Sequence, residues 1–189
     1  VGPSTSLPKS IGWLLIRSYY SAFFAAHALL RIFGRTCSQL DAAQLASVHA
    51  VADLYGNRGG VSLTRGQYAG AINVVTKHIA LKKRSGGDGG SHGAMWSMFL
   101  ELIRTLTSGI LSGPSTAAAQ QVATKLFELD NALTWAGATN GTWLSQMRNR
   151  TNYQMSFGAW FPYSERVRYY DALIPATDLW RSDPMKIDI

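Results

Sequence analysis

The hydrophobic pattern along this 189-residue chain predicts helices almost throughout, beginning with the most apolar segment, residues 11–33. That segment is long enough to span a bilayer. Arg17 and His27 lie inside it and Arg31 lies near its end, and charge at membrane depth is costly. We therefore expect a helix buried on nearly all sides rather than a membrane span, ending at Gly34.

Two capping-box patterns predict the next two helices. The sequence Ser38-Gln-Leu-Asp41 opens one helix, which Gly56 closes, and Thr64-Arg-Gly-Gln67 opens another. The second of these helices carries apolar residues at helical spacing, namely Tyr68, Ile72, Val75 and Ile79. The glycine-rich stretch 85–93 lacks the lysine of a phosphate-cradling loop, so we expect a flexible loop there.

The second half of the chain continues the helical pattern. Apolar residues three or four positions apart predict helices over about 94–111, from Ser115 to Leu133, from Thr142 to about Gln154, and after Ser164. No stretch alternates convincingly with period two, so no strand is expected. The sequence predicts an all-α fold: residues 1–189 form a single domain, a helical bundle of about six to seven helices.

Composition narrows the class of protein and of partner. A charged content of 15% beside 47% hydrophobic residues excludes a solvated, disordered chain. The formal net charge of +7 favours an anionic partner such as nucleic acid. A single cysteine, Cys37, excludes an intrachain disulfide and a thiolate zinc site among these residues, and a reducing, cytoplasmic location is expected. The four histidines show no metal-ligand spacing, so neither a metal nor a cofactor is predicted.

The one run of basic residues consists of Lys82, Lys83 and Arg84, and two interpretations of it stay open. Positive charge is favourable in the last turn of a helix, where the carbonyl ends of the helix dipole lie. The same three side chains could instead contact the phosphates of a nucleic acid.

The densest polar cluster is the segment Ser145–Gln154. On a helix, Arg148 and Asn152 are four residues apart, and so are Asn149 and Tyr153, so two neighbouring polar stripes result. A guanidinium binds phosphate in a planar fork and can stabilise charge on a scissile phosphate, while amides can orient a ribose or a base edge. A merely solvated helix face is the alternative interpretation.

Two segments together resemble the HEPN family. The stretch Arg17-Ser-Tyr-Tyr-Ser-Ala-Phe-Phe-Ala-Ala-His-Ala-Leu-Leu30 resembles the opening helix of HEPN domains. Arg148-Asn-Arg-Thr-Asn-Tyr153 is similar to their later signature, an arginine followed after about four residues by histidine or, in many members, by tyrosine. No histidine follows Arg148 in the rest of the chain. The resemblance implies a helical bundle that usually dimerises, and in many members a metal-independent ribonuclease.

The resemblance implies an RNA- or nucleotide-binding module of a prokaryotic defence or toxin–antitoxin system, with metal-independent ribonuclease activity left open. It also implies a homodimer and a nucleotidyltransferase or defence ATPase as a partner. A non-catalytic helical interaction domain that docks on a partner protein is the alternative. The candidate catalytic residues are Arg148, Asn149 and Tyr153, and the candidate nucleic-acid-binding residues are Arg150, Asn152, Lys82, Lys83 and Arg84.

Overall fold

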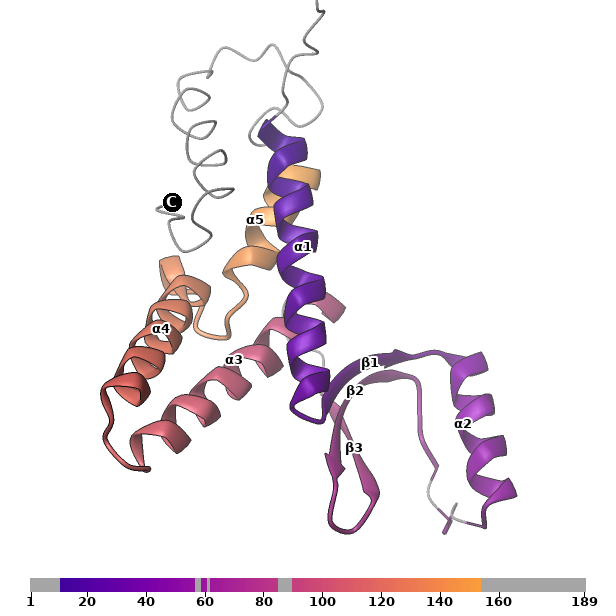
Figure 1. The fold of residues 1–189 in the computed structure, drawn as a ribbon. Helices are drawn as coiled ribbons and strands as arrows, with labels where there is room; N and C mark the ends of the chain where they lie inside the picture. The colour runs from indigo at the N-terminus through magenta and orange to yellow at the C-terminus, as the bar shows by residue number, and fades with distance from the viewer. Residues whose placement is uncertain (1–10, 57–58, 61, 85–89, 154–189) are drawn as a thin grey trace, which may run out of the picture. The chain divides into compact units, whose positions relative to one another are not determined.

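A computed structural model describes residues 11–56, 59–60, 62–84 and 90–153 of the chain (Figure 1). The described residues group into two compact units. We call residues 11–20 with 147–153 the terminal unit, and the described residues from 21 to 146 the central unit. The helices α1 (Ile11–Ile32) and α5 (Trp143–Tyr153) contribute residues to both units.

The central unit contains a three-stranded antiparallel sheet with the strand order β1-β2-β3. Its strands are β1 (Arg35–Leu40), β2 (Gly66–Asn73) and β3 (His78–Arg84). The described chain is therefore mixed α/β, and the expectation of an all-α bundle of six to seven helices is wrong. The helices of the described residues are α1, α2 (Ala42–Leu54), α3 (Gly90–Leu111), α4 (Ala117–Leu133), the short 3-10 turn η1 (Trp135–Gly137) and α5.

The hairpin β2–β3 replaces the helix predicted after Thr64. The apolar spacing of residues 68–79 suits a helix, but the segment is rich in β-branched side chains, which fit a pleated strand better. Asn73 Oδ1 accepts hydrogen bonds from the backbone amides of Val75 (3.0 Å) and Thr76 (3.1 Å), which stabilises a turn. Lys77 completes that turn in the left-handed region, with a φ of 57°.

The predicted second helix is confirmed as α2, with a different first residue. Asp41 is its N-cap: the carboxylate accepts from the backbone amide of Gln44 at 2.8 Å, and the Gln44 side chain accepts from the Asp41 amide at 2.9 Å. The capping box is therefore Asp41 with Gln44. Ser38, which the sequence favoured as the cap, lies in β1 because that segment pairs with β2.

The helices α3 and α4 form a helical hairpin, and Figure 1 shows them side by side. Thr116 caps α4 by accepting from the Ala119 amide at 3.1 Å, one residue later than the predicted Ser115. Both predicted helices are confirmed, and α3 begins earlier than expected. Of the predicted flexible loop 85–93, residues 90–93 belong to α3 and residues 85–89 lie outside the described residues, as does everything after Tyr153.

The core of the central unit is centred on Trp96 of α3, which is 1% exposed. Its ring lies 6.3 Å from that of Phe23 in α1 and 5.9 Å from that of Phe99, centroid to centroid. Gly141 packs against the same helix: a Cβ there would lie 3.2 Å from the Cβ of Leu100, and its φ of +70° also favours glycine. The segment before α5 therefore approaches α3 closely.

The helix α1 is confirmed over most of the predicted segment, and Gly34 follows it in the left-handed region with a φ of +67°. Burial on nearly all sides is wrong. The buried residues form one stripe, Ile16, Tyr19, Ala26 and Leu30. On the other faces Phe24 is 65% exposed and Ile32 is 75% exposed. In the part of the chain that the structure describes, no helix combines the length and the apolar character needed to cross a membrane.

Candidate functional site

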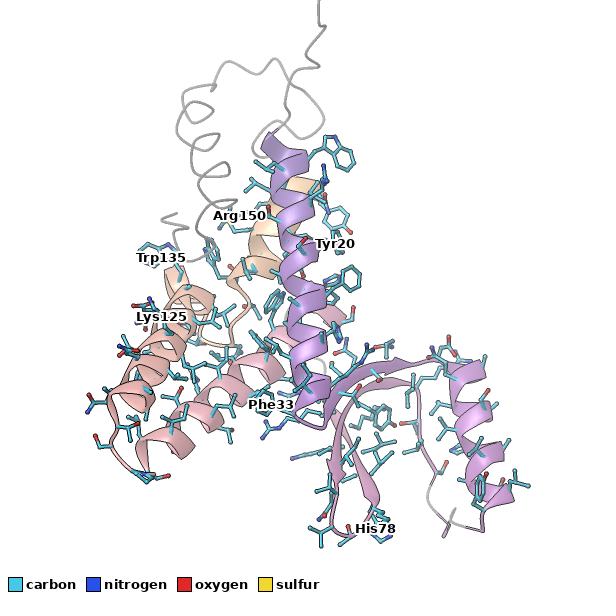
Figure 2. The ribbon with its side chains drawn as sticks, viewed as in Figure 1. Tyr20, Phe33, His78, Lys125, Trp135 and Arg150 are labelled. Atoms are coloured by element: carbon cyan, nitrogen blue, oxygen red, sulfur yellow. The ribbon has the colours of Figure 1, made fainter. Side chains whose placement is uncertain are left out.

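Arg148 on α5 is the centre of a polar cluster in the terminal unit. Its Nη1 donates to Asn149 Oδ1 at 2.9 Å and to Tyr153 Oη at 3.2 Å. Its Nη2 donates to the phenol oxygen of Tyr20 on α1 at 3.0 Å, across 128 positions of sequence. Figure 2 labels Tyr20 on its helix. We call these four residues the Arg148 cluster.

The two phenols of the Arg148 cluster also present their rings to the guanidinium. The Cζ atom of Arg148 lies 5.9 Å from the centre of the Tyr20 ring and 5.1 Å from the centre of the Tyr153 ring. At these distances the negative ring faces attract a cation. Tyr20 is partly buried whereas Tyr153 is 70% exposed, so one ring of the cluster is shielded from solvent more than the other.

The environment of Arg148 keeps it protonated. Burial by itself lowers the pKa of Arg148, but the hydrogen bonds and charge interactions with Tyr20, and then with Tyr153, outweigh burial and raise that pKa above its ordinary value. The guanidinium is therefore a permanent positive charge held in a defined position.

The hydrogen-bonding capacity of Arg148 is incompletely used. A guanidinium carries five N–H donors, and the described acceptors are three. The Nε atom is buried and has no acceptor among the described residues. A buried donor without an acceptor costs about 1–3 kcal/mol.

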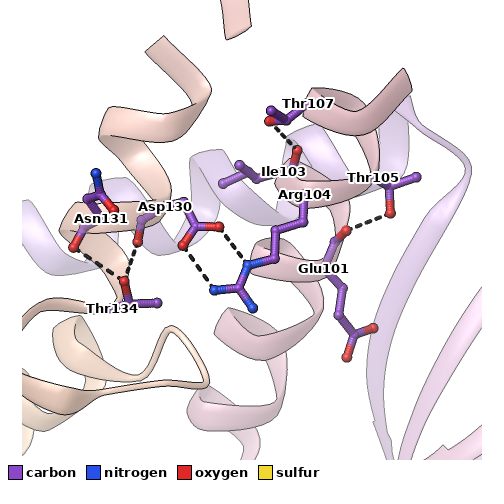
Figure 3. Close-up of polar contacts among 8 residues, drawn as sticks. All are labelled: Glu101, Ile103, Arg104, Thr105, Thr107, Asp130, Asn131 and Thr134. Atoms are coloured by element: carbon purple, nitrogen blue, oxygen red, sulfur yellow. Dashed lines mark hydrogen bonds and ion pairs between the residues drawn. The ribbon is translucent and has the colours of Figure 1, made fainter. Parts of the chain in front are cut away.

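Two arginines of the central unit, Arg84 and Arg104, are bound differently. Arg104 donates from Nε and Nη2 to both carboxylate oxygens of Asp130, at 2.6 and 3.0 Å (Figure 3). Arg84 donates to Glu101 at 2.8 and 3.3 Å. Both arginines are thus paired with a carboxylate, whereas the described partners of Arg148 are one amide and two phenols, all without formal charge.

The remaining residues of the predicted polar segment lie apart from this cluster. Arg150 is exposed and Asn152 is half-buried, and no hydrogen bond from either to Arg148 is described. Thr151 is 1% exposed and its hydroxyl donates to the backbone oxygen of Met147 at 2.9 Å. Arg148 therefore joins the stripe of Asn149 and Tyr153, and Asn152 is outside the cluster.

The basic run lies at the end of β3 in the central unit, so its interpretation as a helix end is wrong. Arg84 is paired with Glu101 and also donates to the Ser97 hydroxyl at 3.3 Å. Lys83 donates to the Thr64 hydroxyl at 2.7 Å. Because side chains alternate across a strand, Lys82 and Lys83 point to opposite faces of the sheet, and the run does not form one patch.

Tyr20 is the one member of the Arg148 cluster that sequence reasoning did not assign to a site. It lies in the segment Arg17–Leu30 that carries the family resemblance, beside a second tyrosine, Tyr19. The two rings contact each other edge to face, with centroids 5.3 Å apart. Tyr19 is buried and Tyr20 is partly exposed. A tyrosine pair on an amphipathic helix was the available signal, but its partner was not predictable from helical spacing.

A hollow of about 270 Å³ lies between α3 and α4. It is lined by Arg104, Thr107, Ser108, Leu111, Phe127 and Asp130. Its two charged side chains are paired with each other, so the hollow offers no uncompensated charge from them. Within the described ranges, no group of three or more His, Cys, Asp or Glu side chains could hold a metal ion.

Comparisons of the chain with protein-family models, with curated proteins and with solved structures give no match. The HEPN resemblance stays a prediction, and functional inference depends on the geometry of the site.

Proposed function

We propose that this chain binds the phosphate group of an RNA or a nucleotide through Arg148. The observation that carries the proposal is that all described partners of Arg148 are uncharged. A guanidinium held by uncharged acceptors keeps its attraction for an anion, whereas one paired with a carboxylate has that attraction largely compensated. Arg148 therefore differs from Arg84 and Arg104 in the property that phosphate binding requires.

The cluster also reduces the cost of binding. Hydrogen bonds to Tyr20 and Tyr153 hold the guanidinium in place, so less side-chain freedom is lost when a ligand arrives. The exposed Tyr153 ring is available to a base or a ribose beside the phosphate, because stacking on an aromatic face is tolerant of base identity. The net charge of +7 adds a sequence-independent attraction for RNA.

The same site is the candidate for the metal-independent RNA cleavage that the HEPN resemblance implies. Arg148 would stabilise the charge that develops on a scissile phosphate, with Asn149 and Tyr153 beside it. The all-α bundle is not part of this proposal. The homodimer and the nucleotidyltransferase or defence-ATPase partner stay predictions that depend on the resemblance.

Binding is tested with the full chain and a fluorescein-labelled oligouridylate, by fluorescence anisotropy in EDTA. Arg148→Gln should weaken binding about tenfold or more, because it removes the charge at the site. Arg104→Gln, which removes an arginine already paired with Asp130, is the matched control and should leave the affinity within about twofold. Equal loss in the two variants would mean that only net charge matters, and would end the proposal.

Cleavage is tested separately by following the length of the same oligonucleotide in EDTA. If the wild-type chain degrades it, Arg148→Ala should abolish degradation while the circular dichroism spectrum stays unchanged. Degradation by that variant at the wild-type rate would remove the Arg148 cluster as a catalytic site.

A further inference from the structure

The hairpin β2–β3 exposes an unusual number of aliphatic side chains. Five of them are between 40% and 87% exposed: Ile72, Val74, Val75, Ile79 and Leu81. Single exposed aliphatic residues are normal on a protein surface, but five within residues 72–81 of one hairpin are a local concentration. We call these five residues the hairpin surface, and His78 in Figure 2 labels the start of its second strand.

Three members of the hairpin surface lie on one face of the sheet. Ile72 is directly opposite Ile79 in the antiparallel register, and Gly70 is opposite Leu81. A Cβ at Gly70 would lie 3.3 Å from Leu81 Cδ2 and 2.5 Å from Thr36 Cγ2, so Leu81 covers the glycine from this face. Because side chains alternate, Ile72, Ile79 and Leu81 point the same way.

The hairpin is basic as well as apolar. Residues 62–84 contain no aspartate or glutamate, and their basic residues are Arg65, Lys77, Lys82, Lys83 and Arg84. Of these, Arg84 is paired with Glu101 of α3, and Lys83 donates to an uncharged hydroxyl, that of Thr64. The strand β3 therefore presents lysine charge that no carboxylate from the hairpin itself compensates.

Strand β3 lies at the edge of the sheet. In the order β1-β2-β3 it pairs with β2 on one side, and no described strand lies on the other. The unpaired backbone groups of an edge strand are a template on which an extended segment can add a further strand. Alternate side chains of the added strand then contact the hairpin surface.

Charge and side-chain type decide between the occupants of this edge. A second copy of the chain is disfavoured, because antiparallel pairing of β3 with itself brings Lys82 and Lys83 close to the basic residues of its copy. Single-stranded RNA binds through exposed aromatic rings, but the aromatic residue of the hairpin, Tyr68, is 3% exposed. The Tyr68 hydroxyl donates to the backbone oxygen of Thr64 at 2.7 Å, which holds the ring inward.

We propose that β3 is a docking edge for an extended acidic segment of a partner protein, in which aliphatic residues alternate with glutamate or aspartate. The aliphatic residues pack on Ile79 and Leu81, and the carboxylates, which point to the opposite face, meet Lys82. This proposal does not depend on the Arg148 cluster, which belongs to the other compact unit.

The test uses the full chain and a fluorescein-labelled peptide of alternating glutamate and valine, seven residues long like β3. Binding is measured by fluorescence anisotropy, and the site by amide hydrogen exchange. The peptide should bind and should slow exchange in residues 78–84. A peptide with lysine in place of glutamate should not bind, because it meets like charge.

Variants locate the peptide site. Ile79→Ser and Lys82→Ser should each weaken peptide binding about two- to fivefold. Both side chains are exposed, so the variants should keep the wild-type circular dichroism spectrum. Val122→Ser and Lys125→Ser, at exposed positions of α4, are the matched controls and should leave binding unchanged.

The proposal would be overturned by no binding of the acidic peptide, by equal effects of the β3 and α4 variants, or by a concentration-dependent dimer that Ile79→Ser abolishes. Displacement of the peptide by oligouridylate would assign this edge to RNA instead and would also overturn it. Arg148→Gln should leave peptide binding intact, so this proposal and the proposed function can fail independently.

Discussion

Arg84 and Arg104 of the central unit differ from Arg148 of the terminal unit in what surrounds them. In the central unit, Arg104 directs its Nε and Nη2 atoms at both oxygens of Asp130, and Arg84 is paired with Glu101. In the terminal unit, Arg148 is held by Asn149, Tyr153 and Tyr20, and its Nε has no described acceptor. In the first arrangement a carboxylate compensates the charge of the guanidinium, and in the second the described partners carry no formal charge.

The comparison teaches that the number of arginines in a segment says little about anion binding. An arginine paired with a carboxylate has most of its attraction for phosphate compensated, however exposed it is. Arg104 shows this, since its side chain is 54% exposed and yet its charge is matched by Asp130. Two substitutions test this with almost no change of side-chain shape: Asn149→Asp gives Arg148 a carboxylate, and Asp130→Asn removes the carboxylate of Arg104.

The largest effect is expected from giving Arg148 a carboxylate. Asn149→Asp replaces the amide oxygen that accepts from Nη1 at 2.9 Å by a charged oxygen of the same size. A hydrogen bond between charged groups is stronger than one with an uncharged acceptor, so RNA affinity should fall about tenfold in the anisotropy assay.

Gln146→Glu is the matched control for that variant. It adds the same charge to α5 at an exposed residue two positions before Arg148, a spacing at which helical side chains do not face each other, and affinity should fall only about twofold. Equal losses would show that the pairing of Arg148 is irrelevant and would remove the distinction between the two kinds of arginine.

A smaller effect is expected from removing the carboxylate of Arg104. Asp130→Asn keeps the shape of the side chain but loses the charge of a two-bonded ion pair, so the free energy of unfolding in urea should fall by about 1 kcal/mol. RNA affinity should not decrease, because the Arg104 guanidinium no longer has the Asp130 carboxylate as its counter-charge.

Glu128→Gln serves as the control for the ion-pair geometry. Lys125 and Glu128 form a single 2.8 Å contact between two exposed side chains, so its loss should cost less than about 0.5 kcal/mol. An equal cost for the two variants would contradict a special role for the two-bonded pair.

The smallest expected effect is a pH dependence of stability, which should arise from His27 in the central unit and should not extend to RNA binding at Arg148. Burial, and then the charge of Arg31, lower the pKa of His27, whose ring lies 4.7 Å from that of Phe23. The unfolded chain then binds a proton more tightly than the folded one, with an unfolded pKa of about 6.5. Stability should therefore be constant above about pH 6.5 and decrease as the pH falls below it.

His27→Gln should flatten that decrease in urea unfolding, whereas His78→Gln, at an exposed position, should not. All four histidines lie between residues 27 and 92, so RNA affinity at Arg148 should change little over the range in which the fold remains intact. If the stability of His27→Gln depended on pH as that of the wild type does, the pH dependence could not be assigned to His27.

The helices were largely predictable from local patterns. Apolar spacing, capping residues and breaking glycines located α1, α2, α3, α4 and α5, because each of these signals acts within a few residues of the chain. The error at residues 64–84 has a physical cause. Apolar residues three and four positions apart also occur in this hairpin, which has glycines at 66 and 70. Pairing with β1, which begins some 30 residues earlier, decided between a helix and a hairpin.

The candidate site, too, was predictable only where it depends on local sequence patterns. Helical spacing predicted Asn149 and Tyr153 as one stripe, but it assigned Arg148 to the neighbouring stripe with Asn152, and the structure joins Arg148 to Asn149 and Tyr153 instead. The hydrogen bond from Arg148 to Tyr20 was not predictable, since it joins residues 128 positions apart. The pairing of Arg84 with Glu101, 17 positions away, was hidden for the same reason, and it changed the meaning of the basic run.

The sequence by itself determined most of the helical segments, the positive net charge and the stripe of Asn149 and Tyr153 on α5. Only the tertiary structure decided which arginines are compensated, where the basic run lies and which aliphatic residues remain exposed. The reason is that the interaction between charges, and the burial of apolar surface, depend on distances in space between elements far apart in the chain.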